Sequence, residues 1–196
     1  MVAPALPPPT KAVRPVWHVI RRGEELRRIW TPGGRGWRAT DFRVGPPRYR
    51  FDHHDPAESR RAILYAGLSL SCCVAEKYGD FDVLEPASDR LCVLRAVEPI
   101  RVLDLRGAAA EHAGTVAGIG AFVDVAFTQA WSRYFYQTLG AEGLLYSAAH
   151  NAAPAVALYE RVAAKIEAVA TWPMDADELR ADLLQACEEN NLIFLG

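Results

Sequence analysis

The chain of 196 residues lacks the short motifs that mark several large classes of enzyme. It has no G-x-x-x-x-G-K-[ST] loop and no G-x-G-x-x-G turn, so neither a P-loop fold nor a dinucleotide-binding α/β fold is indicated. It also has no G-x-S-x-G elbow of the α/β-hydrolase type. The glycines of "GGRG" at 33–36 indicate a flexible loop that carries a cation, which is weak evidence for a phosphate site on its own.

Cysteine is sparse, and its spacing gives no metal site. The four cysteines form no C-x-x-C pair, and no histidine spacing completes a zinc pattern. All four lie in apolar surroundings, which favours buried, reduced thiols and a reducing compartment. The run His53, His54 and Asp55 fits an exposed turn better than a metal site, because adjacent side chains of an extended segment point to opposite sides. We therefore expect no bound metal.

Lysine is also scarce, since only Lys11, Lys77 and Lys165 occur among the 22 basic residues. The net charge of −2 gives no general electrostatic attraction to nucleic acid or to an anionic membrane. No run of about 18 apolar residues is present, and prolines break up the N-terminus where a signal peptide would need an apolar core. We expect a cytoplasmic protein with no membrane span and no direct contact with nucleic acid. The many arginines suit bidentate binding of phosphate or carboxylate.

The signals that are present indicate one domain with mixed strands and helices. Residues 1–15 are rich in proline and predict a flexible lead-in, followed by a domain over 16–196. Expected strands lie at 16–20, 48–52, 62–66, 91–97, 100–105 and 143–147, and expected helices at 70–78, 119–138 and 175–191. Residues 23–47 are expected to form a long loop, and 154–172 mix helix and strand signals. The elements do not alternate strictly, so we expect an α+β fold of mixed or antiparallel sheets with flanking helices.

A few polar residues stand in apolar segments and are the candidates for chemistry: His18, Arg50, Tyr65, Glu76 and Ser147. Glu76 follows small apolar residues on the expected helix 70–78, where a buried carboxylate would need a cation or a functional pocket. Taken singly, each of these residues also fits a purely structural role. Glu76 fits a solvated helix position beside Lys77, Arg50 fits a surface strand, and Ser147 fits a turn.

Taken together, these segments resemble the RES domain family, which is named after its Arg, Glu and Ser residues. The resemblance covers roughly residues 16–160 and lies in "YRFD" at 49–52, "LY" at 64–65, "AE" at 75–76 and "EGLLYS" at 142–147. The segment "VWHVI" at 16–20 resembles the family's opening strand. The sequence departs from the pattern at His18, where the family usually has Arg. It also departs at Tyr49, where Gly is common, and at Ala148, where Arg is frequent.

The resemblance implies a fold similar to ADP-ribosyltransferases and a toxin of a bacterial toxin–antitoxin pair. Such toxins degrade NAD by cleaving the nicotinamide–ribose bond, through hydrolysis or phosphorolysis, so NAD is a substrate and no cofactor is implied. The implied partner is an antitoxin that carries a helix-turn-helix and a segment that blocks the toxin's pocket.

The resemblance also implies a role for each candidate residue. Arg50 would bind the NAD phosphates, and Tyr65 would stack on or orient the nicotinamide. Glu76 would bind the adjoining ribose and stabilise the cationic transition state. Ser147 would hydrogen-bond within the site. Either His18 would replace the first-strand Arg as a ligand of the nucleotide, or Arg21 or Arg22 would reach into the site instead.

The chemistry of the residue types agrees with these roles. Cleavage of an N-glycosidic bond develops oxocarbenium character, which a fixed carboxylate stabilises. Nicotinamide leaves as a neutral base and needs no proton, so one carboxylate suffices. Two alternatives stay open: transfer of ADP-ribose to a macromolecule, and a non-catalytic module that binds a nucleotide or a partner. The sequence does not decide whether water or phosphate accepts the ADP-ribosyl group. It also does not decide whether the protein forms a homo-oligomer.

Overall fold

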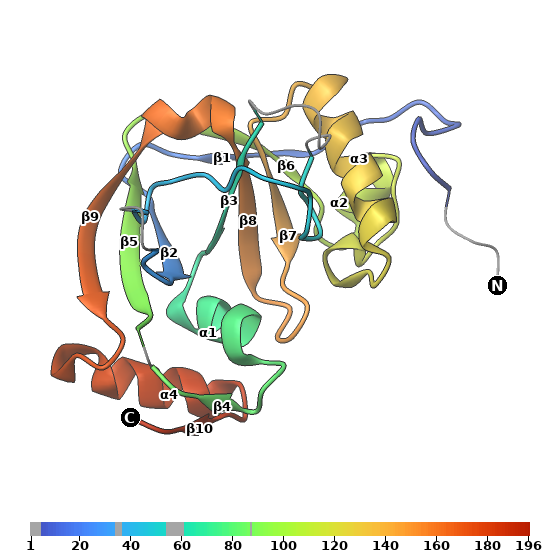
Figure 1. Ribbon diagram of the computed structural model, residues 1–196. Helices are drawn as coiled ribbons and strands as arrows, with labels where there is room; N and C mark the ends of the chain where they lie inside the picture. The colour runs from blue at the N-terminus through green and yellow to red at the C-terminus, as the bar shows by residue number, and fades with distance from the viewer. Residues whose placement is uncertain (1–4, 34–36, 54–60, 87) are drawn as a thin grey trace.

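The computed structural model describes residues 5–33, 37–53, 61–86 and 88–196 and has the expected α+β fold (Figure 1). The strands are β1 (Trp17–Ile20), β2 (Glu25–Trp30), β3 (Ile63–Gly67), β4 (Val83–Leu84), β5 (Arg90–Ala96), β6 (Ile100–Asp104), β7 (Gly143–Ser147), β8 (Pro154–Tyr159), β9 (Ile166–Pro173) and β10 (Ile193–Phe194). The α-helices are α1 (Leu70–Tyr78), α2 (Ala108–His112), α3 (Val125–Gln137) and α4 (Arg180–Glu189). Three short 3₁₀ segments are η1 (Ile119–Ala121), η2 (Glu160–Lys165) and η3 (Asp177–Leu179).

Eight strands form one curled sheet in the order β1-β6-β7-β8-β3-β2-β5-β9 (Figure 1). All neighbours are antiparallel except the parallel pair β6 and β7. The sheet has two halves that meet at one point, because β2 pairs with β3 only through Arg27 and Gly67. By contrast, β2 pairs with β5 over its whole length. Among the described strands, the ladder of the sheet therefore joins its two halves only beside Gly67.

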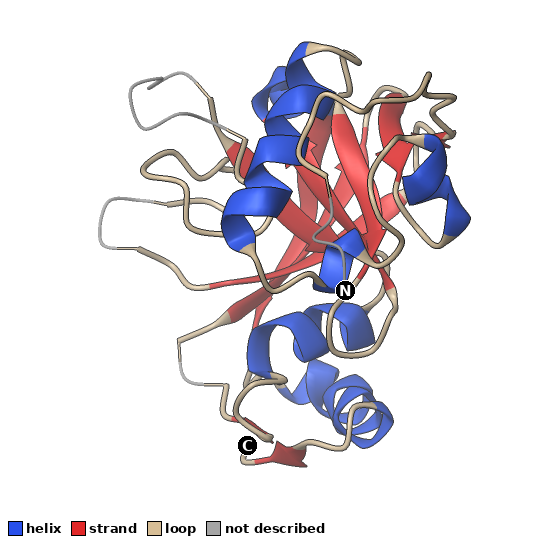
Figure 2. Ribbon diagram, turned by 90° about the vertical axis from the view of Figure 1, so that its right-hand side faces the viewer, coloured by secondary structure: helices blue, strands red, loops and turns tan. Residues whose placement is uncertain are grey.

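Strand alternation divides the core between the two faces of the sheet. On β7, Leu144 and Tyr146 pack on one face with residues of α2 and α3, whereas Leu145 packs on the other face inside the curl. Figure 2 shows the helices beside the sheet. A third cluster joins α1 and α4 to the short pair β4 and β10. In the described part of the chain, no helix is long and apolar enough to cross a membrane.

Helix α1 has the bounds that its sequence predicts. The Ser69 side chain caps it by accepting a hydrogen bond from the Cys72 N–H at 3.1 Å, and Gly79 ends it. Gly67 lets the helix approach β3, since a Cβ at this position would lie 2.9 Å from the Cys73 Sγ. All four cysteines are buried and free, as predicted. Burial raises the pKa of the Cys73 thiol to about 12, which makes it unreactive.

Several predicted elements were wrong. The expected loop 23–47 contains β2, and residues 48–52 form a turn where a strand was expected. The expected helix 119–138 is a 3₁₀ turn followed by α3, which begins after the cap residue Asp124. The undecided stretch is β8, η2 and β9. His53 was expected on an exposed turn but is fully buried; His54 and Asp55 lie outside the described residues.

Candidate active site

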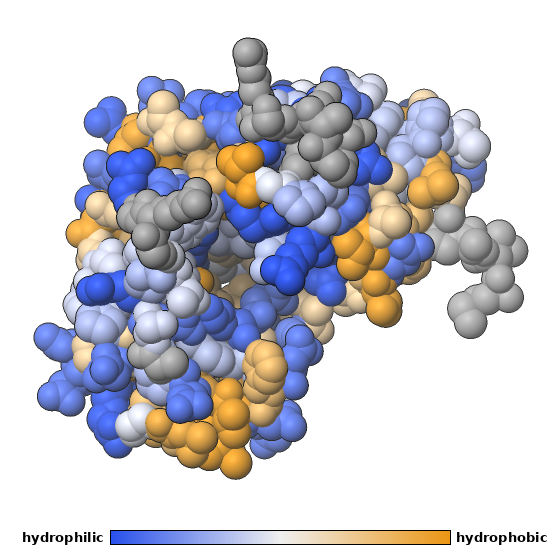
Figure 3. All heavy atoms as spheres, viewed as in Figure 1, coloured by the Kyte–Doolittle hydropathy of each residue, from blue (hydrophilic) through white to orange (hydrophobic). Residues whose placement is uncertain are grey.

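A cleft of about 600 Å³ opens where the two halves of the sheet separate. Its lining includes β2 and β3 on either side of the Arg27–Gly67 pair, the exposed side of α1, the irregular segment 48–50, and the end of β7 with the turn after it. Figure 3 shows a hollow near the middle of this face, bordered largely by hydrophilic residues. A cleft of this volume is of the size that small-molecule sites have.

Three of the five candidate residues line this one cleft: Arg50, Tyr65 and Glu76. They come from three different elements, namely the turn at 48–52, β3 and α1. The chain passes from β3 to α1 through Gly67, and this connection places Tyr65 and Glu76 on neighbouring walls. The structure thus brings an aromatic ring, a cation and a carboxylate to one site.

The carboxylate of Glu76 is exposed on the cleft side of α1. Its Oε1 accepts a hydrogen bond from the Ala149 N–H at 2.8 Å, which fixes the side chain against the turn after β7. The buried phenol of Tyr146 lies near this charge. Burial raises the pKa of Tyr146 well above its ordinary value, the negative Glu76 raises it further, and Arg50 lowers it. Tyr146 is therefore a neutral side chain of the cleft lining that feels both the carboxylate and the guanidinium.

Arg50 is half-buried, and it makes no ion pair with a carboxylate among the described residues. Its Nε–H donates to the backbone carbonyl of Phe122 at 3.2 Å. This contact orients the guanidinium and leaves its two terminal nitrogens for a ligand. A planar fork of this kind suits the paired oxygens of a phosphate.

The ring of Tyr65 lines the cleft, whereas its hydroxyl forms hydrogen bonds with other groups of the protein. The hydroxyl accepts from the Phe51 N–H at 3.1 Å and donates to the Asp52 carboxylate at 3.1 Å. The ring also meets the Tyr49 ring edge-on, at 6.0 Å between centroids. Burial raises the pKa of Tyr65 well above the ordinary value, so the phenol stays neutral.

The other cations of the cleft differ in how much of their charge is already paired. Arg43 pairs with Asp52, and the Lys77 ammonium lies 2.9 Å from Asp89. The Arg28 guanidinium donates to backbone carbonyls of the 39–41 segment, and burial lowers its pKa to about 10. The guanidinium of Arg48 has no partner within the described residues. Together with Arg50 it is the charge best placed to receive an anion.

The remaining two candidates are not brought to the cleft. His18 lines a separate hollow of about 230 Å³, together with Leu145 and Val156, which face the inside of the curled sheet. Ser147 is not among the described residues that line the cleft, because it follows Tyr146 on β7 and points to the opposite face. The roles predicted for these two residues stay predictions, and the geometry gives them no contact with the site.

The sequence did not single out several residues that line the cleft, among them Arg28, Arg48 and Tyr146. Tyr146 stood inside the quoted segment "EGLLYS", and strand alternation would have shown that it and Ser147 cannot face the same side. Arg28 was hidden because β2 was taken for loop. His150 was missed as well; it lines the cleft and lies 3.5 Å from Asp80.

Comparison with known proteins gives a consistent result. Residues 25–177 match the RES domain family. The matched range begins at Glu25, so it leaves out β1 and His18. The crystal structure of the M. tuberculosis MbcT–MbcA toxin–antitoxin complex contains a similar chain, with a TM-score of 0.58 and 19% identity over 83% of this chain and 92% of that one. No curated protein matches the sequence.

Proposed function

The chain belongs to the RES domain family, and from this premise we propose that it is the toxin of a toxin–antitoxin pair and acts by degrading NAD. The proposed reaction breaks the bond between nicotinamide and ribose and passes the ADP-ribosyl group to water or phosphate. NAD is the substrate, and the reaction needs no cofactor.

One observation carries this proposal: Arg50, Tyr65 and Glu76 line the same cleft. Each group suits one part of the substrate. The open fork of Arg50 suits the pyrophosphate, and the ring of Tyr65 suits the flat, cationic nicotinamide. The exposed carboxylate of Glu76 suits the ribose that becomes positively charged as the bond breaks.

The fixed position of Glu76 matters for the rate. A carboxylate that is already held in place stabilises developing positive charge without the cost of reorganising solvent. In this chain the Ala149 N–H holds Oε1, and Oε2 has no hydrogen-bond partner within the described residues. Nicotinamide leaves as a neutral base, so the site needs no general acid to protonate the leaving group.

The proposed protein partner is an antitoxin. The similar structure is that of a toxin–antitoxin complex, which supports a partner of this kind for the present chain. We propose, from the family resemblance, that the antitoxin carries a helix-turn-helix and covers the cleft. The cytoplasm is the compartment where such a pair would act on NAD.

The direct test is to incubate the purified protein, freed of any antitoxin, with NAD in the presence and absence of phosphate. We expect NAD to disappear and nicotinamide to be released. Free ADP-ribose identifies water as the acceptor, and its phosphorylated form identifies phosphate. Folded protein that leaves NAD intact in both conditions would refute the proposal. Label on a macromolecule would instead favour ADP-ribose transfer, and binding without turnover would favour a non-catalytic module.

A further inference from the structure

We infer that Asp52 is a positioning residue for the substrate's phosphates, because its buried carboxylate fixes the turn that carries Arg50. This inference rests on the proposed function, which places the NAD pyrophosphate at Arg50. Asp52 itself is fully buried and does not line the cleft. It acts through the backbone and side chains that it holds.

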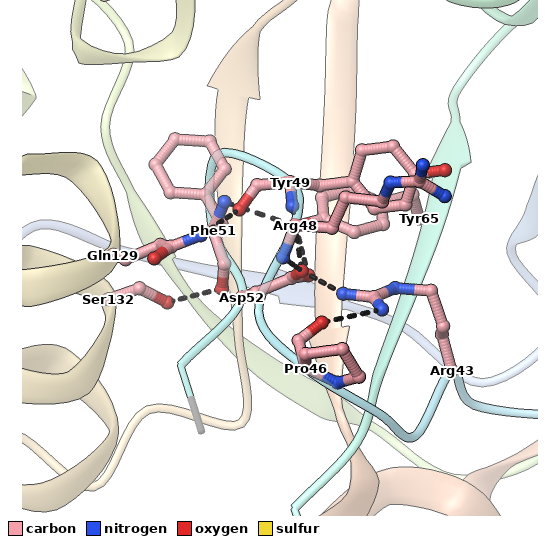
Figure 4. A network of polar contacts seen from close by, with 9 residues as sticks. All are labelled: Arg43, Pro46, Arg48, Tyr49, Phe51, Asp52, Tyr65, Gln129 and Ser132. Atoms are coloured by element: carbon pink, nitrogen blue, oxygen red, sulfur yellow. Dashed lines mark hydrogen bonds and ion pairs between the residues drawn. The ribbon is translucent and has the colours of Figure 1, made fainter. Parts of the chain in front are cut away.

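The Asp52 carboxylate collects four donors (Figure 4). Its Oδ2 accepts from the Arg48 N–H at 2.6 Å, from the Tyr49 N–H at 2.7 Å and from the Arg43 guanidinium. Its Oδ1 accepts from the Tyr65 hydroxyl at 3.1 Å. The chain therefore turns back on itself around one carboxylate, and Arg50 lies within that turn.

The carboxylate replaces the backbone ladder that a strand would have supplied. Residues 48–52 belong to no helix or strand, and the backbone N–H groups of Arg48 and Tyr49 bond to the Asp52 side chain. The Phe51 N–H bonds to the Tyr65 hydroxyl. Both links end on Asp52 or on the tyrosine that Asp52 orients, so the position of Arg50 relative to β3 depends on this side chain.

Helix α3 holds the same turn from the other side (Figure 4). Gln129 donates to the Tyr49 carbonyl at 3.0 Å, and Ser132 donates to the Phe51 carbonyl at 2.7 Å. These two contacts fix to α3 the carbonyl groups of the two residues that flank Arg50. The Asp52 contacts join that assembly to β3 and to Arg43, which also stacks on the Tyr49 ring at 4.9 Å.

A carboxylate is required here because the site supplies an arginine and three further donors. A buried charge is tolerated only where partners replace its water, and removal of one partner leaves the others unsatisfied. Asn at position 52 would keep the shape and one acceptor oxygen, but it would lose the charge that pairs with Arg43. We expect the turn to loosen while the rest of the fold stays intact.

The expected consequence is weaker binding of the phosphates with the chemical step preserved. Loss of an interaction that acts equally in the ground state and the transition state raises KM and leaves kcat unchanged. For Asp52→Asn, we expect the KM for NAD and the Kd for ADP-ribose to rise roughly tenfold, with kcat within about threefold of wild type. ADP-ribose contains the pyrophosphate without the scissile bond, so its binding can be measured by calorimetry without turnover.

The matched control is Asp104→Asn, which removes another carboxylate that is 8% exposed and paired with an arginine, Arg106. Asp104 ends β6 and is not among the described residues that line the cleft. We expect this variant to bind ADP-ribose like wild type. A second variant, Tyr65→Phe, keeps Asp52 but removes the hydroxyl link to Phe51, and we expect a loss of ADP-ribose affinity of roughly threefold in the same direction.

The outcomes separate this inference from the proposed function. Wild type that binds ADP-ribose but leaves NAD intact refutes the proposed reaction, while Asp52 is still tested by calorimetry. The inference is overturned if Asp52→Asn binds ADP-ribose like wild type, or if kcat falls as much as affinity. It is also overturned if wild type does not bind ADP-ribose. Should Asp52→Asn fail to fold, unchanged ADP-ribose binding by Tyr65→Phe would overturn it as well.

Discussion

The two walls of the cleft are built in opposite ways. The wall that carries Glu76 is a regular helix, whose backbone bonds to itself and whose N-terminus is capped by the local residue Ser69. The wall that carries Arg50 is an irregular turn, whose backbone is held by side chains from β3, α3 and Asp52. The helix wall depends on local sequence, and the turn wall depends on contacts between distant segments. This difference predicts how each wall responds to substitution.

The largest effect is expected from the helix wall, at its carboxylate. Glu76→Gln keeps the oxygen that accepts from the Ala149 N–H and removes the charge. We expect kcat for NAD cleavage to fall by about 10²-fold or more, as when another fixed electrostatic stabiliser is removed, with little change in KM. Steady-state kinetics measures this, and ADP-ribose binding serves as the control for folding. A fully active variant would reject the role of Glu76.

The next effect concerns how closely the helix wall approaches the sheet. At Gly67, a Cβ would lie 2.9 Å from the Cys73 Sγ and 3.0 Å from the Cys72 Cβ. We expect Gly67→Ala to lower the free energy of unfolding by about 1–3 kcal/mol, which is typical for overpacking. Denaturant unfolding measures the change.

The matched control for this variant is Gly33→Ala, where the nearest atom would be the Trp37 Cβ at an ordinary 3.4 Å. We expect its stability to stay close to wild type. If the two alanine variants are equally stable, α1 can shift away from β3 at no cost in stability. The helix wall would then be less rigid than its contacts indicate.

A smaller effect is expected at the turn wall. Arg50→Gln removes the open fork but keeps a side chain that can donate to the Phe122 carbonyl. We expect the KM for NAD to rise roughly tenfold with kcat nearly unchanged, because phosphate binding is shared by the ground state and the transition state. The control is Arg101→Gln, since Arg101 stacks on Trp17 at the far edge of the sheet, 3.7 Å from the ring centroid. A loss in kcat alone would place Arg50 at the reacting bond instead.

The same contrast explains how much of the structure the sequence predicts. Helix α1 is predicted to the residue, because the signals of Ser69 and Gly79 are local. The turn at 48–52 is predicted wrongly as a strand, because its aromatic residues have strand propensity and nothing nearby shows that Asp52 accepts the N–H groups of Arg48 and Tyr49. Strand β2 is missed for a similar reason. Its charged residues are typical of a loop. The strand that pairs with β2 over its whole length is β5, which begins some 65 residues later in the sequence.

The candidate site follows the same rule. Tyr65 and Glu76 are found from one contiguous stretch, and the structure places both at the cleft. Ser147 is one residue away from Tyr146, which lines the cleft in its place, since strand alternation decides which of the two faces inward. His18 lines a separate hollow on the inside of the curled sheet, and a strand's place in a sheet is not encoded in its own residues.

The smallest effect near neutral pH is expected from the carboxylate of Glu160, which contacts the residue after the turn and the start of the segment that leads into β3. Glu160 accepts a hydrogen bond from the Ala62 N–H at 3.1 Å. It also lies 3.1 Å from the ring of His53, which directly follows the turn 48–52 in sequence. These bonds, with one from Tyr136, outweigh burial and lower the pKa of Glu160 to about 2. Because the pKa is lower in the folded state, the stabilisation is fully present above the unfolded value near 4.5 and is lost as the pH falls toward 2.

Acid should therefore loosen the turn wall before the helix wall. Between pH 5 and about 3, we expect amide hydrogen exchange at Tyr49 and Phe51 to accelerate relative to Cys72 and Cys73 on α1, after correction for intrinsic rates. Glu160→Gln keeps the acceptor for the Ala62 N–H without a titrating charge, so its exchange at the turn should depend less on pH. If acid accelerates exchange equally at the turn and at α1, the two walls open as one unit, and the contrast between locally and distantly supported walls fails for their dynamics.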